Sequence, residues 1–129
     1  MKTSALFMLA LLLMAGVVYA KDFEVKKKVG EYDMIVMIDK NPPITGDNNM
    51  AVRVRDSAGK DITDAKVKVE YSMPAMPGMP PMIYKAEAAL SGSEYRTKVN
   101  FPMSGSWNVV IKAARSGKTA AAKLTVDVR

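Results

Sequence analysis

From residue 22 onward the sequence alternates between apolar and polar side chains with a period of two, and turn-forming residues interrupt this alternation at short intervals. Residues 65–71, for example, alternate alanine, valine and tyrosine with lysine and glutamate, and residues 94–101 continue in the same way. A period of two places successive side chains on opposite faces of a strand. About eight such segments, with no helical period among them, predict an all-β antiparallel sandwich.

The expected strands lie at residues 23–29, 32–39, 50–55, 65–71, 84–88, 94–101, 107–113 and 120–128. Turns are expected between them at residues 40–43, 46–49, 56–60, 91–93 and 115–118, which are rich in Asn, Pro, Gly, Asp and Ser. Residues 32–39 are apolar on both faces in the middle, which indicates a central strand. The last two strands are expected to form a hairpin over Ser116-Gly117, and no linker divides the chain.

The first twenty residues have the pattern of an export signal. Lys2 precedes an uncharged, mostly apolar run over residues 3–20, which ends in Val18-Tyr19-Ala20. A basic start, an apolar centre and small residues at the end predict a signal peptide at residues 1–20 that is cut after Ala20. Residues 21–129 would then be a periplasmic or secreted domain. The rival interpretation is an uncleaved N-terminal membrane anchor, since the run reaches the lower end of the roughly 17–25 residues that span a bilayer.

The composition excludes several kinds of site. The 129 residues contain no Cys and no His, so disulfides, thiolate metal sites and histidine-based acid–base catalysis are ruled out. No nucleophile with a partner base is visible, so we do not expect an enzyme. The formal charge is +6, but most basic residues alternate with apolar ones and read as a solvated strand face rather than a nucleic-acid site. Weak attraction of Lys26-Lys27-Lys28 to anionic lipid is the alternative.

The most informative segment runs from Tyr71 to Met82 and has the sequence Tyr-Ser-Met-Pro-Ala-Met-Pro-Gly-Met-Pro-Pro-Met. Four methionines, Met73, Met76, Met79 and Met82, recur at a spacing of three, with four prolines among them. Proline removes backbone donors, so this segment cannot be an interior strand. An unbroken polyproline II run would hold successive methionines roughly 9 Å apart, too far for neighbouring sulfurs to share an ion.

A turn removes this difficulty. Met76-Pro77-Gly78-Met79 fits a type II turn, which brings its first and last Cα atoms within about 7 Å. We therefore expect Met76 and Met79 as the central pair of a metal site, with Met73 or Met82 as a third ligand. Thioether sulfur is soft and neutral and favours copper(I), and by the same argument silver(I). No acidic residue lies between Glu70 and Glu87, so an oxygen-based site is not expected there.

Two other interpretations of the segment stay open. Methionine adapts readily to apolar surfaces, so the exposed segment is also suited to docking onto another exported or membrane protein without metal. Some of the methionines would alternatively pack on the sandwich core, as we expect for Met34, Met37 and Met50. Trp107, the first inward residue of its strand, is expected to be a core anchor; the alternative is a cation–π contact to a metal near Met103.

Residues 54–79 resemble the YtkA-like domain family. The resemblance rests on three motifs: Asp56-Ser57-Ala58-Gly59-Lys60, Ala65-Lys66-Val67 and the run from Met73 to Met79. In addition, Gly105-Ser106-Trp107 is similar to the Gly-x-Trp motif at a strand start of that family. The resemblance implies an exported, immunoglobulin-like antiparallel β-sandwich of about 7–8 strands. It extends over about residues 24–128.

The resemblance also implies a role in copper or heavy-metal handling, with a membrane transporter or an oxidase-assembly system as partner. Met73, Met76 and Met79 match the methionine positions of the family. Several relatives have a histidine in this neighbourhood, whereas this chain has none. The resemblance therefore implies a thioether site of the copper(I) type rather than a copper(II) site. No organic cofactor and no small-molecule substrate are expected.

Overall fold

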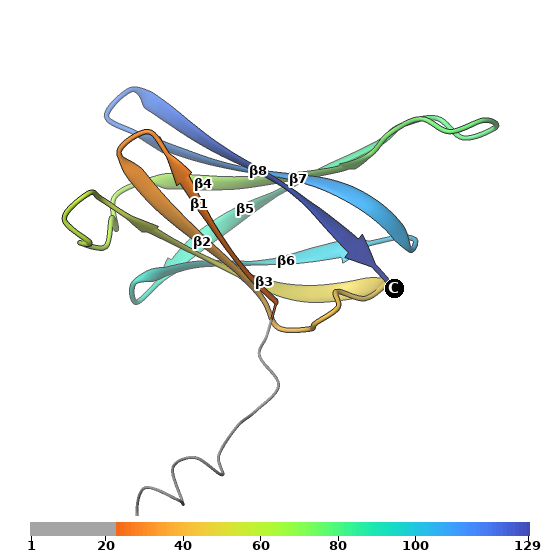
Figure 1. Cartoon of the computed structure of the whole chain (residues 1–129), viewed down its shortest axis with the longest axis horizontal. Coiled ribbons are helices and arrows are strands. Elements are labelled where there is room, and N and C mark those ends of the chain that lie inside the picture. Colours follow the sequence, from red (N-terminus) through yellow and green to blue (C-terminus); the bar gives the residue numbers. More distant parts are fainter. Residues whose placement is uncertain (1–22) are drawn as a thin grey trace, which may run out of the picture.

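The computed structural model describes residues 23–129, which form eight antiparallel strands (Figure 1). The strands are β1 (Phe23–Val29), β2 (Tyr32–Ile38), β3 (Gly46–Arg55), β4 (Lys66–Met73), β5 (Met82–Ser91), β6 (Glu94–Phe101), β7 (Gly105–Arg115) and β8 (Lys118–Val128). The predicted signal peptide at residues 1–20 lies outside the described residues. Within residues 23–129, no helix has the length and apolar character needed to cross a bilayer.

The strands follow the order β1-β2-β3-β6-β5-β4-β7-β8 in one continuous sheet. Strand β5 pairs with β4 over residues 82–88 and then with β6 over residues 89–91, so it links the two halves of the sheet. Without β1, the order β2-β3-β6-β5 and β4-β7-β8 is that of the two immunoglobulin sheets. The end strands β1 and β8 also approach each other. The predicted all-β, immunoglobulin-like fold is confirmed, with a sheet that folds round on itself through β5.

The period of two in the sequence sets which residues enter the core. In β4 the side chains of Val67, Val69, Tyr71 and Met73 are buried, and the residues between them face outward. The neighbouring strand β7 contributes Trp107 and further buried residues in the same way. The expected hairpin over Ser116-Gly117 is also present, since β7 pairs with β8 up to Arg115 and Lys118.

Basic side chains on the outer face of β4, β5 and β7 pair with acidic ones across the strands. Glu70 lies 3.1 Å from the Lys112 ammonium and 3.6 Å from the Lys85 ammonium. The hydrogen bond from Lys112 lowers the pKa of the Glu70 carboxyl against a smaller opposing effect of desolvation, and Lys85 lowers it further. This part of the surface is thus the solvated, charge-paired face that the alternation predicts.

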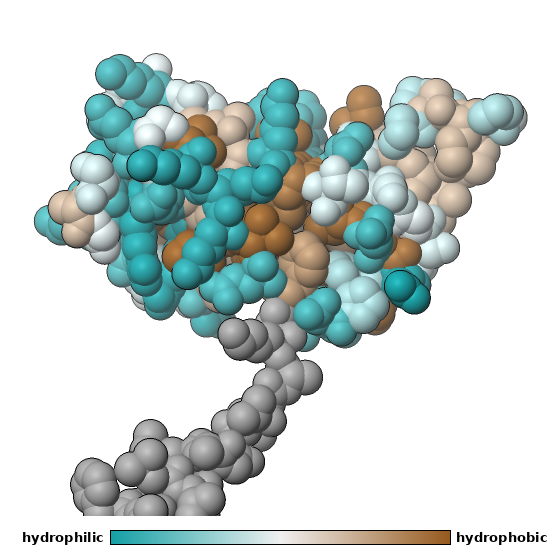
Figure 2. Space-filling view, viewed as in Figure 1, coloured by the Kyte–Doolittle hydropathy of each residue, from teal (hydrophilic) through white to brown (hydrophobic). Residues whose placement is uncertain are grey.

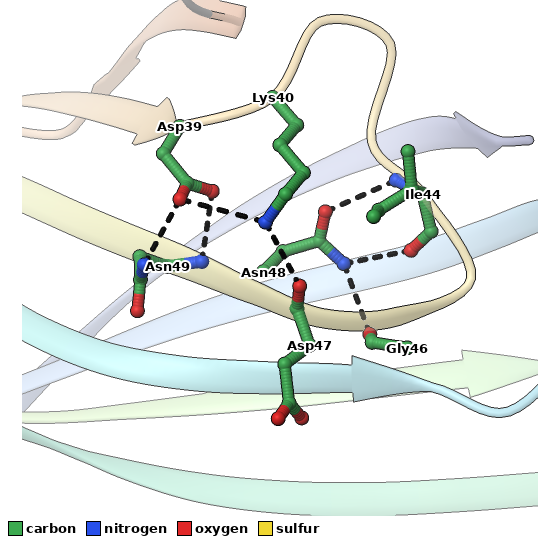
Figure 3. Close-up of polar contacts among 7 residues, drawn as sticks. All are labelled: Asp39, Lys40, Ile44, Gly46, Asp47, Asn48 and Asn49. Atoms are coloured by element: carbon green, nitrogen blue, oxygen red, sulfur yellow. Dashed lines mark hydrogen bonds and ion pairs between the residues drawn. The ribbon is translucent and has the colours of Figure 1, made fainter.

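Residues 46–49, expected as a turn, are instead the start of β3. The buried side chain of Asn48 explains the difference (Figure 3): its amide donates to the carbonyl oxygens of Ile44 at 2.7 Å and Gly46 at 3.1 Å, and its oxygen accepts from the Ile44 N–H at 3.0 Å. Asn48 therefore satisfies, from inside the sandwich, the hydrogen-bonding groups of the backbone just before and at the start of β3. Residues 46–49 thus form part of a strand although their residue types are typical of turns, because the buried Asn48 is fully hydrogen-bonded to the preceding backbone.

Asp39 holds the outer side of the same loop (Figure 3). Its carboxylate accepts hydrogen bonds from the backbone N–H and the side-chain amide of Asn49, each at 2.9 Å, and lies 3.6 Å from the Lys40 ammonium. Desolvation raises the pKa of Asp39, but the bonds from Asn49 and the charge of Lys40 together lower it below its ordinary value.

Gly105 opens β7 in a conformation that favours glycine, with φ of 130°. A Cβ atom at this position would lie 2.9 Å from the Cε atom of Met73, whose side chain is only 3% exposed. The methionine methyl group thus occupies the space that any other residue at position 105 would need.

We predict that Gly105→Ala destabilises the domain by about 1–3 kcal/mol, because it adds backbone strain and displaces Met73. The measurement is the midpoint of thermal unfolding. Gly46→Ala is the matched control, since Gly46 has φ of 97° but no neighbouring atom within 4 Å of an added Cβ. Gly105→Ala should destabilise the domain more than Gly46→Ala does, and this difference should vanish in a Met73→Leu background, which lacks the Cε atom. Equal destabilisation by the two glycine substitutions would contradict the proposed contact with Met73.

Candidate functional site

The connection between β4 and β5 projects from the body as an arm (Figure 1). Residues 74–81, here called the Met-Pro arm, are all exposed. Met73 and Met82 form the last pair of the β4–β5 ladder. The four prolines of the arm have no N–H to donate, so they cannot continue the regular ladder outward. The arm therefore leaves the sheet instead of extending it.

The arm ends in the predicted turn. The N–H of Met79 donates to the Met76 carbonyl at 2.8 Å, and the N–H of Met76 donates to the Met79 carbonyl at 3.1 Å. Gly78 has φ of 80°, the value that a type II turn requires at its third residue. The expected turn over Met76-Pro77-Gly78-Met79 is thus confirmed, and it closes through reciprocal hydrogen bonds.

Reciprocal bonding brings the two methionine side chains together. Met76 and Met79 face each other as an isolated antiparallel bridge. Residues directly opposed in this way project to the same side, with Cβ atoms about 4.5–5.5 Å apart. The two residues are 41% and 38% exposed. These two residues, the tip pair, therefore present two neighbouring thioethers to solvent, as the sequence predicted; their role as metal ligands stays a prediction.

The other two predicted ligands lie at the foot of the arm. Met73 is 3% exposed and belongs to the core cluster, where its Cε atom packs at Gly105. Met82 is half-buried and packs against the same core. The fold separates these residues from the tip pair by placing them on regular strands. A third-ligand role for Met73 would require its side chain to leave the core.

A cluster of four aromatic side chains packs together near the base of the arm. Its members are Tyr71, Tyr84, Phe101 and Trp107. The rings of Tyr71 and Tyr84 stack with centroids 5.5 Å apart, and the Trp107 ring lies 6.1 Å from each of them. Trp107 is fully buried and donates its indole N–H to the Met103 carbonyl at 3.0 Å, so the predicted core anchor is confirmed.

Sequence reasoning missed Ile83, which lies outside the strand expected at residues 84–88, and gave no role to Tyr84, which lies within it. Ile83 is 66% exposed and Tyr84 is 38% exposed, so apolar side chains are exposed on both faces of β5 next to the arm. The position of Tyr84 opposite Tyr71 could have been inferred from the turn. Counting outward from Pro77-Gly78 pairs Met73 with Met82 and Tyr71 with Tyr84, as the register has it.

The arm is electrically neutral. No charged residue occurs between Glu70 and Lys85. Among residues 23–129, no group of three or more His, Cys, Asp or Glu side chains is placed to hold a metal ion. Figure 2 shows the arm as a tan and pale lobe beside the teal surface of the body. Among the side chains of the arm, sulfur is therefore the donor that stands out for a soft ion.

Comparison with known proteins supports this architecture. The soluble domain of PmoD from Methylocystis sp. ATCC 49242 (Rockwell) has a similar structure, with a TM-score of 0.53 and 13% identity over 81% of this chain and 96% of that domain. At this identity the similarity concerns the fold alone. No curated protein matches the sequence. The family described as YtkA-like matches residues 24–112, which is more than half of the chain. The chain thus belongs to the YtkA-like family.

Proposed function

We propose that this protein is an exported binding module that takes up copper(I) or silver(I) through the thioethers of Met76 and Met79 and serves copper or heavy-metal handling. The observation that carries the proposal is the reciprocal hydrogen bonding of these two residues, which sets two soft donors side by side at an exposed turn. Thioether ligands select soft monovalent ions over zinc, calcium or magnesium.

The neutrality of the site favours transfer over storage. Thioethers bring no negative charge, and the nearest acidic residues in the sequence, Glu70 and Glu87, lie on strands beyond the arm. The charge of a bound ion therefore stays uncompensated, and the open side of the tip pair remains available to ligands of another protein. A membrane transporter or an oxidase-assembly protein fits this role as the partner that receives or supplies the ion.

A second function uses the same arm without metal. The tip pair, Ile83 and Tyr84 are all exposed at 38% or more, so apolar side chains are exposed both at the tip of the arm and on β5. Such a surface suits docking onto another protein of a membrane complex. The exposure of Ile83, the most exposed of these residues at 66%, is the observation that favours this alternative.

Replacing both tip methionines by leucine separates the two functions. Leucine preserves the apolar bulk and removes the sulfur, so Met76→Leu/Met79→Leu is expected to weaken silver(I) binding by at least about 100-fold while docking and stability stay unchanged. Isothermal titration with silver(I) measures the affinity, and thermal unfolding checks the fold.

Two control variants locate the ligands. Met37→Leu replaces a half-buried methionine of β2, and Met73→Leu replaces the methionine at the foot of the arm. Both are expected to retain silver(I) binding. If the double leucine variant binds silver(I) as tightly as the unchanged protein, the tip pair is not the site. A selective loss in Met73→Leu would place the ligand at the foot instead.

Binding is expected to change little with pH between about pH 5 and pH 8, because a thioether has no proton to lose. Asp39 and Glu70 have lowered pKa values and stay ionised in this range. The stability that they contribute is therefore present throughout and is lost only as the pH falls through these lowered values. Silver(I) titrations at the two limits measure the dependence; a steep change would indicate carboxylate or amine ligands.

A further inference from the structure

Burial divides the methionines of residues 23–129 into clearly different environments. Met34, Met50 and Met73 are 0%, 1% and 3% exposed. Three others, Met37, Met82 and Met103, are half-buried. Met76 and Met79 are 41% and 38% exposed. The tip pair is thus the most accessible thioether surface of the described chain.

Accessibility decides which thioether an oxidant reaches first. Oxidation of methionine requires the oxidant to approach the sulfur, so the rate follows exposure. The chain contains no cysteine, whose thiolate would otherwise react ahead of methionine. Trp107, another oxidisable side chain, is fully buried. An oxidant that meets this protein therefore meets the tip pair before the core.

We propose that Met76 and Met79 form a reversible oxidation site that switches off the soft-donor character of the arm. Each sulfur consumes one molecule of hydrogen peroxide, which transfers one oxygen atom to it: the O–O bond breaks, an S–O bond forms, the sulfur loses two electrons and the remaining oxygen leaves as water. In the reverse step, a reductase supplies two thiols, which become a disulfide while the sulfoxide oxygen leaves as water. The effect on ion binding rests on the proposed function, whereas the oxidation site itself does not.

The fold is arranged to survive this change. The turn is held by the two backbone hydrogen bonds between Met76 and Met79, at 2.8 and 3.1 Å, and by Pro77 and Gly78, none of which involves sulfur. The polar oxygen of each sulfoxide would face water. The same oxidation at Met73, which is 3% exposed, would place an unpartnered polar group in the core and destabilise the folded state. Exposure thus confines the modification to the position where it does no structural damage.

The position of the tip pair also makes the reverse reaction accessible. The Met-Pro arm stands out from the body (Figure 1), and all of its residues are exposed. A reductase can therefore reach both sulfoxides without any strand leaving the sheet. The side chain changes from a soft sulfur donor to a group that binds through oxygen, which copper(I) and silver(I) disfavour.

The test is a timed treatment of the purified protein with dilute hydrogen peroxide, followed by peptide mapping that gives the oxidation rate of each methionine. Met76 and Met79 are expected to react at least about tenfold faster than Met34, Met50 and Met73. Near-ultraviolet circular dichroism of Trp107 should stay unchanged, silver(I) affinity should fall at least about tenfold, and methionine sulfoxide reductase with a dithiol should restore it. Met76→Leu/Met79→Leu should lose the fast phase.

Uniform oxidation of buried and exposed methionines, loss of the Trp107 signal together with tip oxidation, or failure of the reductase would overturn the proposal. Unchanged silver(I) affinity after complete tip oxidation would overturn the switch. Failure of the proposed function has a different signature, because the unoxidised protein would then bind no silver(I). Fast and reversible oxidation of the tip pair, read from the mass spectra, would still establish the modification site in that case.

Discussion

The contact between the foot of the Met-Pro arm and the start of β7 fixes the base from which the tip pair projects into solvent. Met73 places its Cε atom where a side chain at position 105 would be, and Trp107, two residues further on, packs against Tyr71 and Tyr84 on the two strands that carry the arm. This packing anchors both strands of the hairpin to the core immediately before the prolines begin. The arm can therefore project into solvent from a fixed base, although its own residues bury little surface. A loosely packed foot would leave the tip pair on a flexible loop, with more conformational entropy to lose when an ion binds.

The same contact explains why two short sequence motifs occur together in this chain. The methionine–proline run and Gly105-Ser106-Trp107 are separated by two strands in the sequence, yet they form one structural unit. Glycine is required at position 105 by its φ of 130° and by the Met73 methyl group, and tryptophan at position 107 fills the core beneath the arm. The first methionine of the run thus belongs to the scaffold and the next two to the exposed tip. A regular spacing in the sequence hides this division, because burial depends on the neighbouring strand.

The local parts of the structure could be predicted from the sequence, and the parts that depend on distant strands could not. Alternation located the strands, and proline–glycine chemistry placed the turn between Met76 and Met79, because each depends on a few consecutive residues. The burial of Met73 depends on β7, and the change of partner by β5 depends on how the two halves of the sheet meet. Residues 46–49 were wrongly predicted for a related reason. Their polar residues are typical of a turn, but the loop carbonyls and N–H that bond to Asn48 come close to it only in the folded chain.

The two proposed functions, metal binding and protein docking, would use the same exposed surface, and sulfur is what distinguishes them. Exposing apolar side chains such as Ile83 carries a risk of aggregation, which a protein tolerates where the surface has a use. Docking alone would be served by leucine or isoleucine at the tip, and these residues resist oxidation. Methionine at positions 76 and 79, opposed across a reciprocally bonded turn, adds two soft donors and also a susceptibility to oxidants. That susceptibility is easier to explain if the sulfur atoms are themselves required, and it favours the soft ion over the apolar partner as the reason for the tip pair.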